Sequence, residues 1–304
     1  MRLVTYVAAG HERPGVLVPD RDGARVLDLG TTPGLPGTVD AIVADDAALA
    51  AMRDLAASTS PACLPALGQV RLAPPVRPGA IWCLGYNYRG HVPDGADPTA
   101  GDPPYPDIFV KTPNTLIGPG EPVPLPAAAE HVDYEGEIAV VIGRRAHDVP
   151  LDSAMDHVAG YTLFNDVSSR DWQTRSSQWQ LGKCFDGFGP LGPWLVTADE
   201  VPDFHDLLVQ VERDGVLTVS QGTSSMVFAL PFLVHYLSQV VTLQPGDVIS
   251  TGTPQKLPDA LAAHRPLAPG DTVTVRVAGL GSLTTTFVDP SADARIAPHQ
   301  GGRP

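Results

Sequence analysis

Three acidic residues in two short segments have the spacing to act as one chemical group. Glu135 and Glu137 are two residues apart at the start of an apolar run that ends at Ile142. In a strand, residues i and i+2 point to the same face, so both carboxylates are expected to project together. Asp166 follows a second predicted strand at residues 159–165. Two carboxylates a few ångströms apart repel, so one holds a proton unless a cation neutralises both.

Three carboxylates without clustered histidine or cysteine favour a hard cation. Magnesium or manganese is favoured for such a set, and calcium is possible. The plainer interpretation is that Glu135 and Glu137 solvate a strand edge and that Asp166 is a turn residue, because paired glutamates at this spacing are common. The choice between the two interpretations therefore depends on the other motifs of the chain.

Seven short motifs follow one another in a characteristic order. They are Gly85–His91 (GYNYRGH), Asp133–Glu137 (DYEGE), Asn165–Gln173 (NDVSSRDWQ), Gly182–Asp186 (GKCFD), Gly192-Pro193, Pro245–Asp247 (PGD) and Thr251–Pro254 (TGTP). From about Ala73 to Asp289 this order closely resembles the fumarylacetoacetate hydrolase family. The resemblance covers roughly two thirds of the chain.

The resemblance implies both a fold and a chemistry. The expected fold is α+β and mostly β, with a mixed β-sandwich or roll as the catalytic domain behind a small N-terminal α+β domain. Members of the family bind a divalent metal and are usually homodimers. They hydrolyse carbon–carbon bonds in acylpyruvates, decarboxylate oxaloacetate-like acids, or isomerise related dienoates.

By resemblance, Glu135, Glu137 and Asp166 become the metal ligands. The metal would chelate the 2-oxo carboxylate end of a substrate and stabilise the enolate that forms when the adjacent bond breaks. Lys183 would face the substrate, where its ammonium stabilises an oxyanion or enolate. The plainer interpretation of Lys183 is a surface lysine, which its apolar and glycine-rich surroundings disfavour.

Two further residues would bind substrate by the same resemblance. Gln173 would donate hydrogen bonds to a substrate oxygen, and Thr253 would bind the carboxylate through its hydroxyl and backbone N–H. A plain loop amide and a turn-capping threonine are the corresponding structural alternatives.

His91 is the candidate acid/base residue. It lies in the glycine- and proline-rich loop 85–106, which by resemblance closes over the metal, and a histidine near neutrality can take a proton from water. Family hydrolases often carry glutamate three residues later, whereas this chain has Asp94 there, after Pro93. The alternative is an exposed loop histidine.

The chain departs from the family pattern in two places. After Pro254 the family commonly continues with a glycine-rich turn, but here the sequence reads QKLPD at 255–259, with extra residues before Pro269. That segment usually shapes the distal substrate pocket. The loop also holds an unusual proline-, aspartate- and glycine-rich stretch at 93–106. If closure excludes water, decarboxylation or isomerisation is favoured over hydrolysis.

The leading functional prediction is metal-dependent cleavage of a carbon–carbon bond, by hydrolysis or decarboxylation, in a small 2-oxo or β-diketo carboxylic acid. Alternatives are an isomerase or tautomerase of unsaturated oxo-dicarboxylates and a lyase on a ureido or hydroxy acid. A catalytically silent binding scaffold would have lost a metal ligand or Lys183, yet all are present. No serine lies in a G-x-S-x-G context, and Cys184 has no histidine partner placed by sequence.

Short strands and few helices must position these residues. A small N-terminal domain is predicted at 1–70, a catalytic domain at 71–290 and a loose tail at 291–304. Strands are predicted at 2–8, 15–18, 24–29, 80–84, 107–111, 135–142, 159–165, 207–212, 216–221, 247–253, 271–278 and 283–288. One helix is predicted at 40–57 and another from Pro231 to 239, with a proline-rich linker at 60–79.

Composition limits the partners and the compartment. The 304 residues carry a formal charge of −14, which disfavours nucleic acid and anionic membrane surfaces because both are bound through lysine and arginine. Three scattered cysteines form no disulfide framework, and the N-terminal residues lack the apolar block of a signal peptide. Composition therefore predicts a soluble cytoplasmic protein, and the resemblance implies that it acts on a small keto acid and forms a homodimer.

Overall fold

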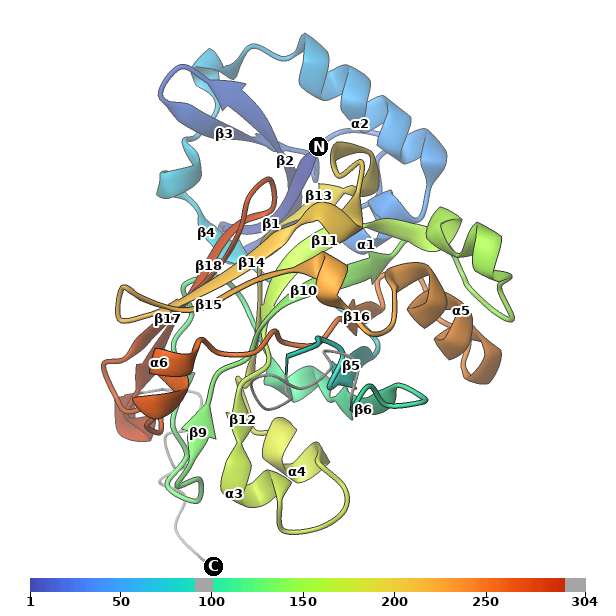
Figure 1. Ribbon diagram of the computed structural model, residues 1–304. Helices are drawn as coiled ribbons and strands as arrows, with labels where there is room; N and C mark the ends of the chain where they lie inside the picture. The colour runs from blue at the N-terminus through green and yellow to red at the C-terminus, as the bar shows by residue number, and fades with distance from the viewer. Residues whose placement is uncertain (91–100, 293–304) are drawn as a thin grey trace, which may run out of the picture.

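Two β-sheets packed face to face form the body of the protein (Figure 1). The computed structural model of the chain describes residues 1–90 and 101–292. The larger sheet has the order β3 (Gly23–Asp28), β2 (His11–Asp20), β1 (Arg2–Ala8), β13 (Gly189–Thr197), β11 (Val158–Asn165), β10 (Gly136–Ile142), β16 (Val248–Ser250), β5 (Ile81–Gly85) and β6 (Asp107–Lys111). Two short strands join it, β4 (Arg71–Ala73) on β1 and β7 (Leu116–Ile117) on β13.

The smaller sheet covers the centre of the larger one. Its order is β15 (Val216–Gly222), β14 (Leu208–Arg213), β17 (Thr272–Val277), β18 (Gly281–Val288) and β8 (Val123–Pro124). A separate two-stranded ladder joins β9 (Val132–Asp133) to β12 (Ser168–Ser169). Most ladders are antiparallel, but β16 with β5, β13 with β7 and β18 with β8 are parallel. The predicted α+β, mostly β class with mixed sheets is confirmed.

The central strand β10 is buried over its whole length, because it has neighbours on both edges and packed layers on both faces. Ile138 and Val140 face the smaller sheet, where Val211 and Val275 belong to the same apolar core. A Cβ atom on Gly136 would lie 2.5 Å from Cγ2 of Val211. Glycine at this position therefore lets the two sheets approach closely beside the acidic residues.

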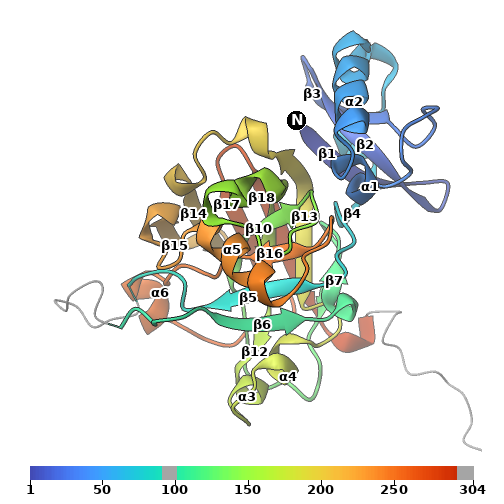
Figure 2. The ribbon, with the colours of Figure 1, turned by 90° about the vertical axis from the view of Figure 1, so that its right-hand side faces the viewer.

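Two helices, not one, pack on the N-terminal strands (Figure 2). The sequence predicts a single helix at 40–57, whereas the structure has α1 (Val39–Val43) and α2 (Asp46–Ser58). Asp45 separates them because its carboxylate accepts hydrogen bonds from the backbone N–H groups of Ala47 and Ala48, which caps α2. The single-helix prediction was wrong at this point.

The predicted linker at 60–79 also contains a strand. Within it, β4 pairs antiparallel with residues 5–7 of β1. The three residues of β4 contain no proline, although prolines of the linker precede and follow them, so an edge strand forms where the composition suggested none. Because β1 pairs with β13, the N-terminal residues extend the main sheet. That residues 1–70 and 71–290 are separate domains remains a prediction.

Strand β13 was not predicted from sequence, although it lies between β1 and β11. It contains two glycines and two prolines, residue types that are unfavourable inside strands. The register between β11 and β13 shifts between Tyr161 and Leu163, opposite Gly192 and Pro193, and this irregularity accommodates a proline that cannot donate to the ladder.

The remaining helices lie at the edges of the sandwich. They are α3 (Arg170–Gln173), α4 (Gln180–Lys183), α5 (Leu230–Val240) and α6 (Pro258–Ala262). The helix predicted from Pro231 is confirmed as α5, with that proline in its first turn. Among residues 1–90 and 101–292, no helix combines the length and apolarity needed to cross a bilayer. Of the predicted tail at 291–304, only the first two residues are described.

Candidate active site and metal centre

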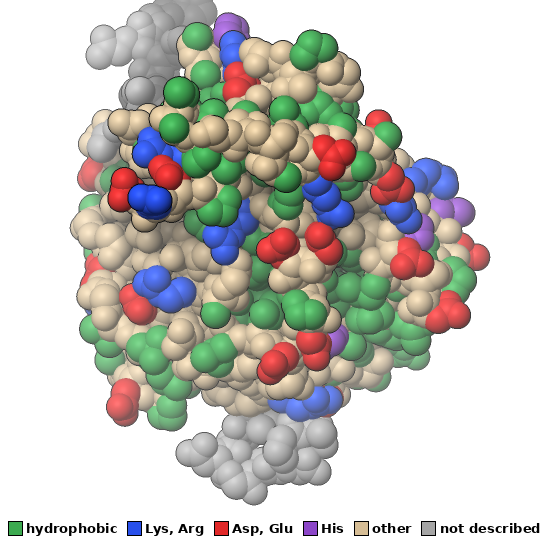
Figure 3. Space-filling view, turned by 90° about the horizontal axis from the view of Figure 1, so that it is seen from above, with side chains coloured by type: hydrophobic (Ala, Val, Ile, Leu, Met, Phe, Trp, Pro, Cys, Tyr) green, Lys and Arg blue, Asp and Glu red, His purple; other side chains and the backbone are tan. Residues whose placement is uncertain are grey.

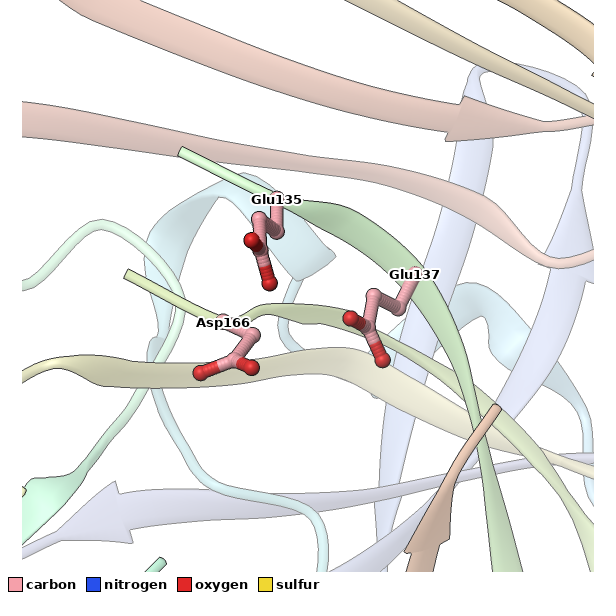
Figure 4. Close-up of side chains that lie close together, drawn as sticks. All are labelled: Glu135, Glu137 and Asp166. Carbon is pink, nitrogen blue, oxygen red and sulfur yellow. The ribbon is translucent and has the colours of Figure 1, made fainter. Parts of the chain in front are cut away.

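The three acidic residues meet where β10 begins and β11 ends. Glu135 directly precedes β10, Glu137 is its second residue, and Asp166 directly follows β11. The two strands are antiparallel neighbours, with Gly136 opposite Asn165, so these ends lie side by side. One carboxylate oxygen from each acid lies within 4.8 Å of the others, and the three groups point into a common space (Figure 4).

Glu137 and Glu135 have opposite electrostatic surroundings. Oε2 of Glu137 accepts hydrogen bonds from the Ser250 hydroxyl and from the Gly252 N–H at 2.9 Å, both neutral donors. Burial, followed by repulsion from Asp166 and Glu135, raises the pKa of Glu137 well above its ordinary value.

Glu135 instead contacts two cations. Arg170 lies 2.6 Å from its Oε1 and Lys183 lies 2.7 Å from its Oε2. Burial alone would raise the pKa of Glu135, but attraction by Arg170 and Lys183 outweighs it and lowers that pKa. Of the two glutamates, Glu137 is therefore the one whose surroundings favour the neutral acid when no cation is bound.

Two buried lysines hold Asp166 from both sides. Nζ of Lys183 lies 2.6 Å from Oδ2, and Nζ of Lys111 lies 2.6 Å from Oδ1 and 3.0 Å from the Val167 carbonyl oxygen. The exposed fraction of the side chain is 2% for Lys183 and 0% for Lys111. Burial would lower the pKa of Lys183, but Asp166 and Glu135 raise it, so this side chain stays an ammonium.

A second layer of charge surrounds Asp133. Arg170 donates to its Oδ2 from Nε at 3.3 Å and from a terminal nitrogen at 2.9 Å, and Lys256 donates to its Oδ1 at 2.6 Å. Burial would raise the pKa of Asp133, but the two cations lower it. Burial lowers the pKa of Lys256, while Asp133 opposes that shift.

The acidic cluster fits a hard divalent cation. Its donors are carboxylate oxygens alone, which are the ligands that magnesium and manganese prefer. Octahedral coordination of magnesium needs oxygens roughly 3–4 Å apart, so the observed spread of 4.8 Å requires only a small inward movement. A cation there would also remove the repulsion that holds a proton on Glu137.

The cluster opens into a pocket of about 290 Å³. Glu135, Lys183, Gln173 and Thr253 line it, together with Lys256 and an apolar wall that includes Phe109 and Trp179. Oε1 of Gln173 accepts from Arg170 at 2.9 Å, and the Thr253 hydroxyl donates to the Gly136 carbonyl at 3.1 Å. His91 and Asp94, the candidate acid/base pair, lie outside the described residues.

Two short helices bring Gln173 and Lys183 into the pocket. Gln173 is the last residue of α3 and Lys183 the last residue of α4, and the two helices pack against each other. A Cβ atom on Gly182 would lie 2.5 Å from the backbone nitrogen of Gln173. The glycine before Lys183 is thus required for this close approach.

Sequence reasoning missed Lys111 and Lys256 and gave Arg170 no role. One available signal is the lysine count, because the whole chain contains three lysines against 17 arginines. Those three, Lys111, Lys183 and Lys256, each form an ion pair with a carboxylate of this site.

Comparison with known proteins gives consistent results. Residues 80–288 match the family model described as fumarylacetoacetate hydrolase, C-terminal. A Burkholderia ambifaria protein named only as a hydrolase is 42% identical over 289 residues, covering 92% of this chain and 96% of the relative. The mitochondrial oxaloacetate tautomerase of Bos taurus is 39% identical over 295 residues, covering 95% of this chain and 92% of the relative.

A solved structure shares the whole architecture. Maleylpyruvate hydrolase from Sphingobium, crystallised with manganese(II) and pyruvate, superposes with a TM-score of 0.77 and is 28% identical in sequence. The match covers 95% of this chain and 99% of that structure.

Proposed function

Because the chain belongs to the fumarylacetoacetate hydrolase family, we propose that it is a divalent-metal-dependent enzyme acting on a small 2-oxo or β-diketo carboxylic acid. The reaction is cleavage of a carbon–carbon bond, by hydrolysis or decarboxylation. The observation that carries this proposal is the convergence of Glu135, Glu137 and Asp166 beside the buried ammonium of Lys183, at the wall of a pocket.

The proposed ion is magnesium or manganese, with calcium possible. A divalent ion held by the three carboxylates would act as a Lewis acid on the 2-oxo group. The manganese and pyruvate in the Sphingobium structure support this assignment, because pyruvate is itself a 2-oxo acid.

The protein's own groups complete the chemistry. When the carbon–carbon bond breaks, its electron pair enters the 2-oxo fragment as an enolate, and the Lys183 ammonium supplies a fixed positive charge beside it. Gln173 and Thr253 line the pocket, and both are proposed to hydrogen-bond substrate oxygens. His91, with Asp94 as its partner, is proposed to take a proton from the water that attacks the acyl carbon.

Tautomerisation is the second candidate reaction, favoured by the 39% identity to the bovine oxaloacetate tautomerase. It needs the same stabilisation of an enolate but no attacking water. The two reactions therefore differ in what they require of His91.

A substrate panel tests the proposal. Oxaloacetate, acylpyruvates and ring-opened dioic acids are mixed with the protein and Mg²⁺ in D₂O, and products are followed by enol absorbance and NMR. We expect metal-dependent cleavage of at least one compound. His91→Ala should suppress hydrolysis more than deuterium exchange at the carbon next to the ketone. Equal loss of both would contradict water activation by His91, and exchange without cleavage in the wild type would favour the tautomerase.

A further inference from the structure

Lys256 is the one lysine of the chain that touches no candidate metal ligand. Lys111 and Lys183 both contact Asp166, whereas Lys256 extends the charged cluster to another part of the pocket. The side chain of Lys256 is 12% exposed, so its charge is largely desolvated. The three lysines of the chain all lie in this site and its other 17 basic side chains are arginine, so a partly buried lysine at this position calls for a specific role.

The backbone on both sides of Lys256 is fixed to strand β15. The N–H of Gln255 donates to the side chain of Gln221 at 3.2 Å, and the N–H of Leu257 donates to the Thr218 carbonyl at 2.8 Å. The ammonium of Lys256 lies over the Tyr134 ring, 4.3 Å from its centre, in a cation–π contact. Lys256 is thus held at the pocket wall before any ligand arrives.

Lys256 is not the only hydrogen-bond donor to Asp133. Two nitrogens of Arg170 already donate to one oxygen of that carboxylate, and Lys256 uses a single donor on the other oxygen. An ammonium has three N–H donors, and besides Asp133 the only other polar contact of Lys256 among the described residues is Nδ1 of His264 at 3.5 Å, so at least one donor remains for a ligand. Contacts link Lys256 through Asp133 and Arg170 to Glu135, and Lys256 and Glu135 line the same pocket, so a ligand in that pocket meets both the acidic cluster and the Lys256 ammonium.

The charge of the site points to the class of ligand. Among the described residues, four cations face four carboxyl groups, namely Lys111, Lys183, Lys256 and Arg170 against Asp133, Glu135, Glu137 and Asp166. When all are ionised, their charges cancel. A divalent ion adds two positive charges, and a dianion restores neutrality where a monoanion leaves one charge unmatched.

We infer that Lys256 binds the second carboxylate of the substrate, so that the enzyme selects 2-oxo dicarboxylic acids over 2-oxo monocarboxylic acids. This inference rests on the proposed function, since the first carboxylate and the 2-oxo group bind at the metal centre. Lys256 is a specificity-determining residue. It belongs to the segment in which this chain departs from the glycine-rich turn of its family, so the preference is a property of this chain's own pocket.

Matched acids of equal chain length test the inference. The probes are 2-oxoglutarate against 2-oxopentanoate and 2-oxoadipate against 2-oxohexanoate, titrated calorimetrically into the protein with Mg²⁺. We expect the wild type to bind at least one diacid about tenfold more tightly than its monoacid, as for a charge-assisted hydrogen bond. Lys256→Met should reduce that ratio to within about twofold and leave monoacid affinity unchanged, while Lys256→Arg retains part of the preference.

Arg265→Met is the control for loss of a positive charge. Arg265 follows α6 and is exposed, and it pairs with Asp271 and Asp214 without lining the pocket of Lys256. This variant should keep the wild-type ratio. Spectra of protein labelled with ¹⁵N-lysine provide an independent measurement, because only three lysine amides contribute. The Lys256 signal should shift more with 2-oxoglutarate than with 2-oxopentanoate.

Two other outcomes would overturn the inference, and a third would contradict the proposed function as well. A wild type that binds monoacids in a metal-dependent way without preferring diacids overturns the inference and leaves the proposed function intact. Equal weakening of both acids in Lys256→Met also overturns it, because Lys256 would then only position Asp133 and Arg170. A wild type that binds Mg²⁺ but none of the four acids contradicts the proposed function itself, and the inference with it.

Discussion

At the residue scale, the site depends on two glutamates that lie two positions apart yet have pKa values shifted in opposite directions. Glu135 is held ionised by Arg170 and Lys183, whereas Glu137 contacts only neutral donors and its pKa is raised. A divalent ion supplies the positive charge that the surroundings of Glu137 lack. Metal binding and ionisation of Glu137 are therefore expected to occur together.

Glu137→Gln tests this coupling. The amide resembles the protonated acid, so we expect the free energy of unfolding of the metal-free protein to change by less than about 1 kcal/mol. Affinity for Mn²⁺ should fall by about tenfold or more, and turnover by roughly 10³-fold, since a ligand charge is lost. Urea denaturation and Mn²⁺ titration measure the two effects. Wild-type metal affinity in this variant would remove Glu137 from the metal centre.

The sequence predicted part of this site. The spacing of Glu135 and Glu137 predicted that their carboxylates share a space, as observed. It could not predict Lys111, which is the last residue of an apolar edge strand and reaches Asp166 only through the tertiary fold. Motifs reveal residues close in sequence, whereas an ion pair between residues 55 positions apart requires the arrangement of the strands.

At the element scale, two short helices, α3 and α4, and the segment around Lys256 determine where the pocket residues lie. Helices α3 and α4 have four residues each, too short to be stable alone, so their positions depend on packing against each other and on β12. Dependence on neighbouring elements also explains why the sequence did not predict strand β13. Strand β13 forms despite its prolines because its neighbours β1 and β11 provide the ladder, with a register shift at Gly192.

Gly182→Ala tests the contact between α3 and α4. The added Cβ would lie 2.5–2.7 Å from atoms of Gln173, including backbone, so one helix must move. We expect a loss of about 1–3 kcal/mol in the free energy of unfolding and a fall in kcat of at least tenfold, as Lys183 and Gln173 are displaced. Gly68→Ala is the control, since its Cβ would meet no atom within 4 Å. Unchanged kcat in Gly182→Ala would contradict this positioning role.

The segment that follows α6 ends at Asp271, whose hydrogen bonds and ion pairs are expected to weaken at low pH. Asp271 accepts hydrogen bonds from Arg213, from Arg265 and from the Ala268 N–H. Burial would raise the pKa of Asp271, but these donors lower it below the ordinary value of 3.8. Because the folded state binds the proton more weakly than the unfolded state does, Asp271 stabilises the fold above about pH 4 and less as the pH falls further.

Asp271→Asn should therefore destabilise the protein in a pH-dependent way. We expect a loss of about 1–3 kcal/mol at pH 7, and a difference from wild type that shrinks as the pH is lowered from 5 towards 3. Urea denaturation across this range measures the difference. A loss that is constant over the whole range would show that the carboxylate charge of Asp271 does not contribute.

At the scale of the whole molecule, the fold brings together residues from distant parts of the chain around one charged cluster. The larger sheet passes from the N-terminal strands to β5 and β6 without interruption, and the site lies near its centre, where β10, β11 and β16 are neighbours (Figure 1). Outside the site, the face seen in Figure 3 carries acidic and basic side chains interspersed with apolar ones. The densest arrangement of buried charge in the described chain is the site itself.

Metal binding should therefore stabilise the whole fold. At Mg²⁺ concentrations about 100-fold above Kd, linkage predicts about 2.7 kcal/mol, which corresponds to an increase of several degrees in Tm. Excess EDTA should reverse the increase, and Glu137→Gln should reduce it to about half or less at the same Mg²⁺ concentration, with NaCl at equal ionic strength as the control. An identical Tm with and without Mg²⁺ would favour a scaffold that binds no metal.

The most direct test of the metal centre is anomalous diffraction from crystals soaked in Mn²⁺. We predict one strong manganese peak between β10 and β11, with an oxygen of Glu135, Glu137 and Asp166 each about 2.1–2.3 Å from it. Crystals that contain manganese elsewhere, or none, would contradict the account if Glu135 and Asp166 kept their ion pairs with Lys111, Lys183 and Arg170 and Glu137 kept its hydrogen bonds with Ser250 and Gly252.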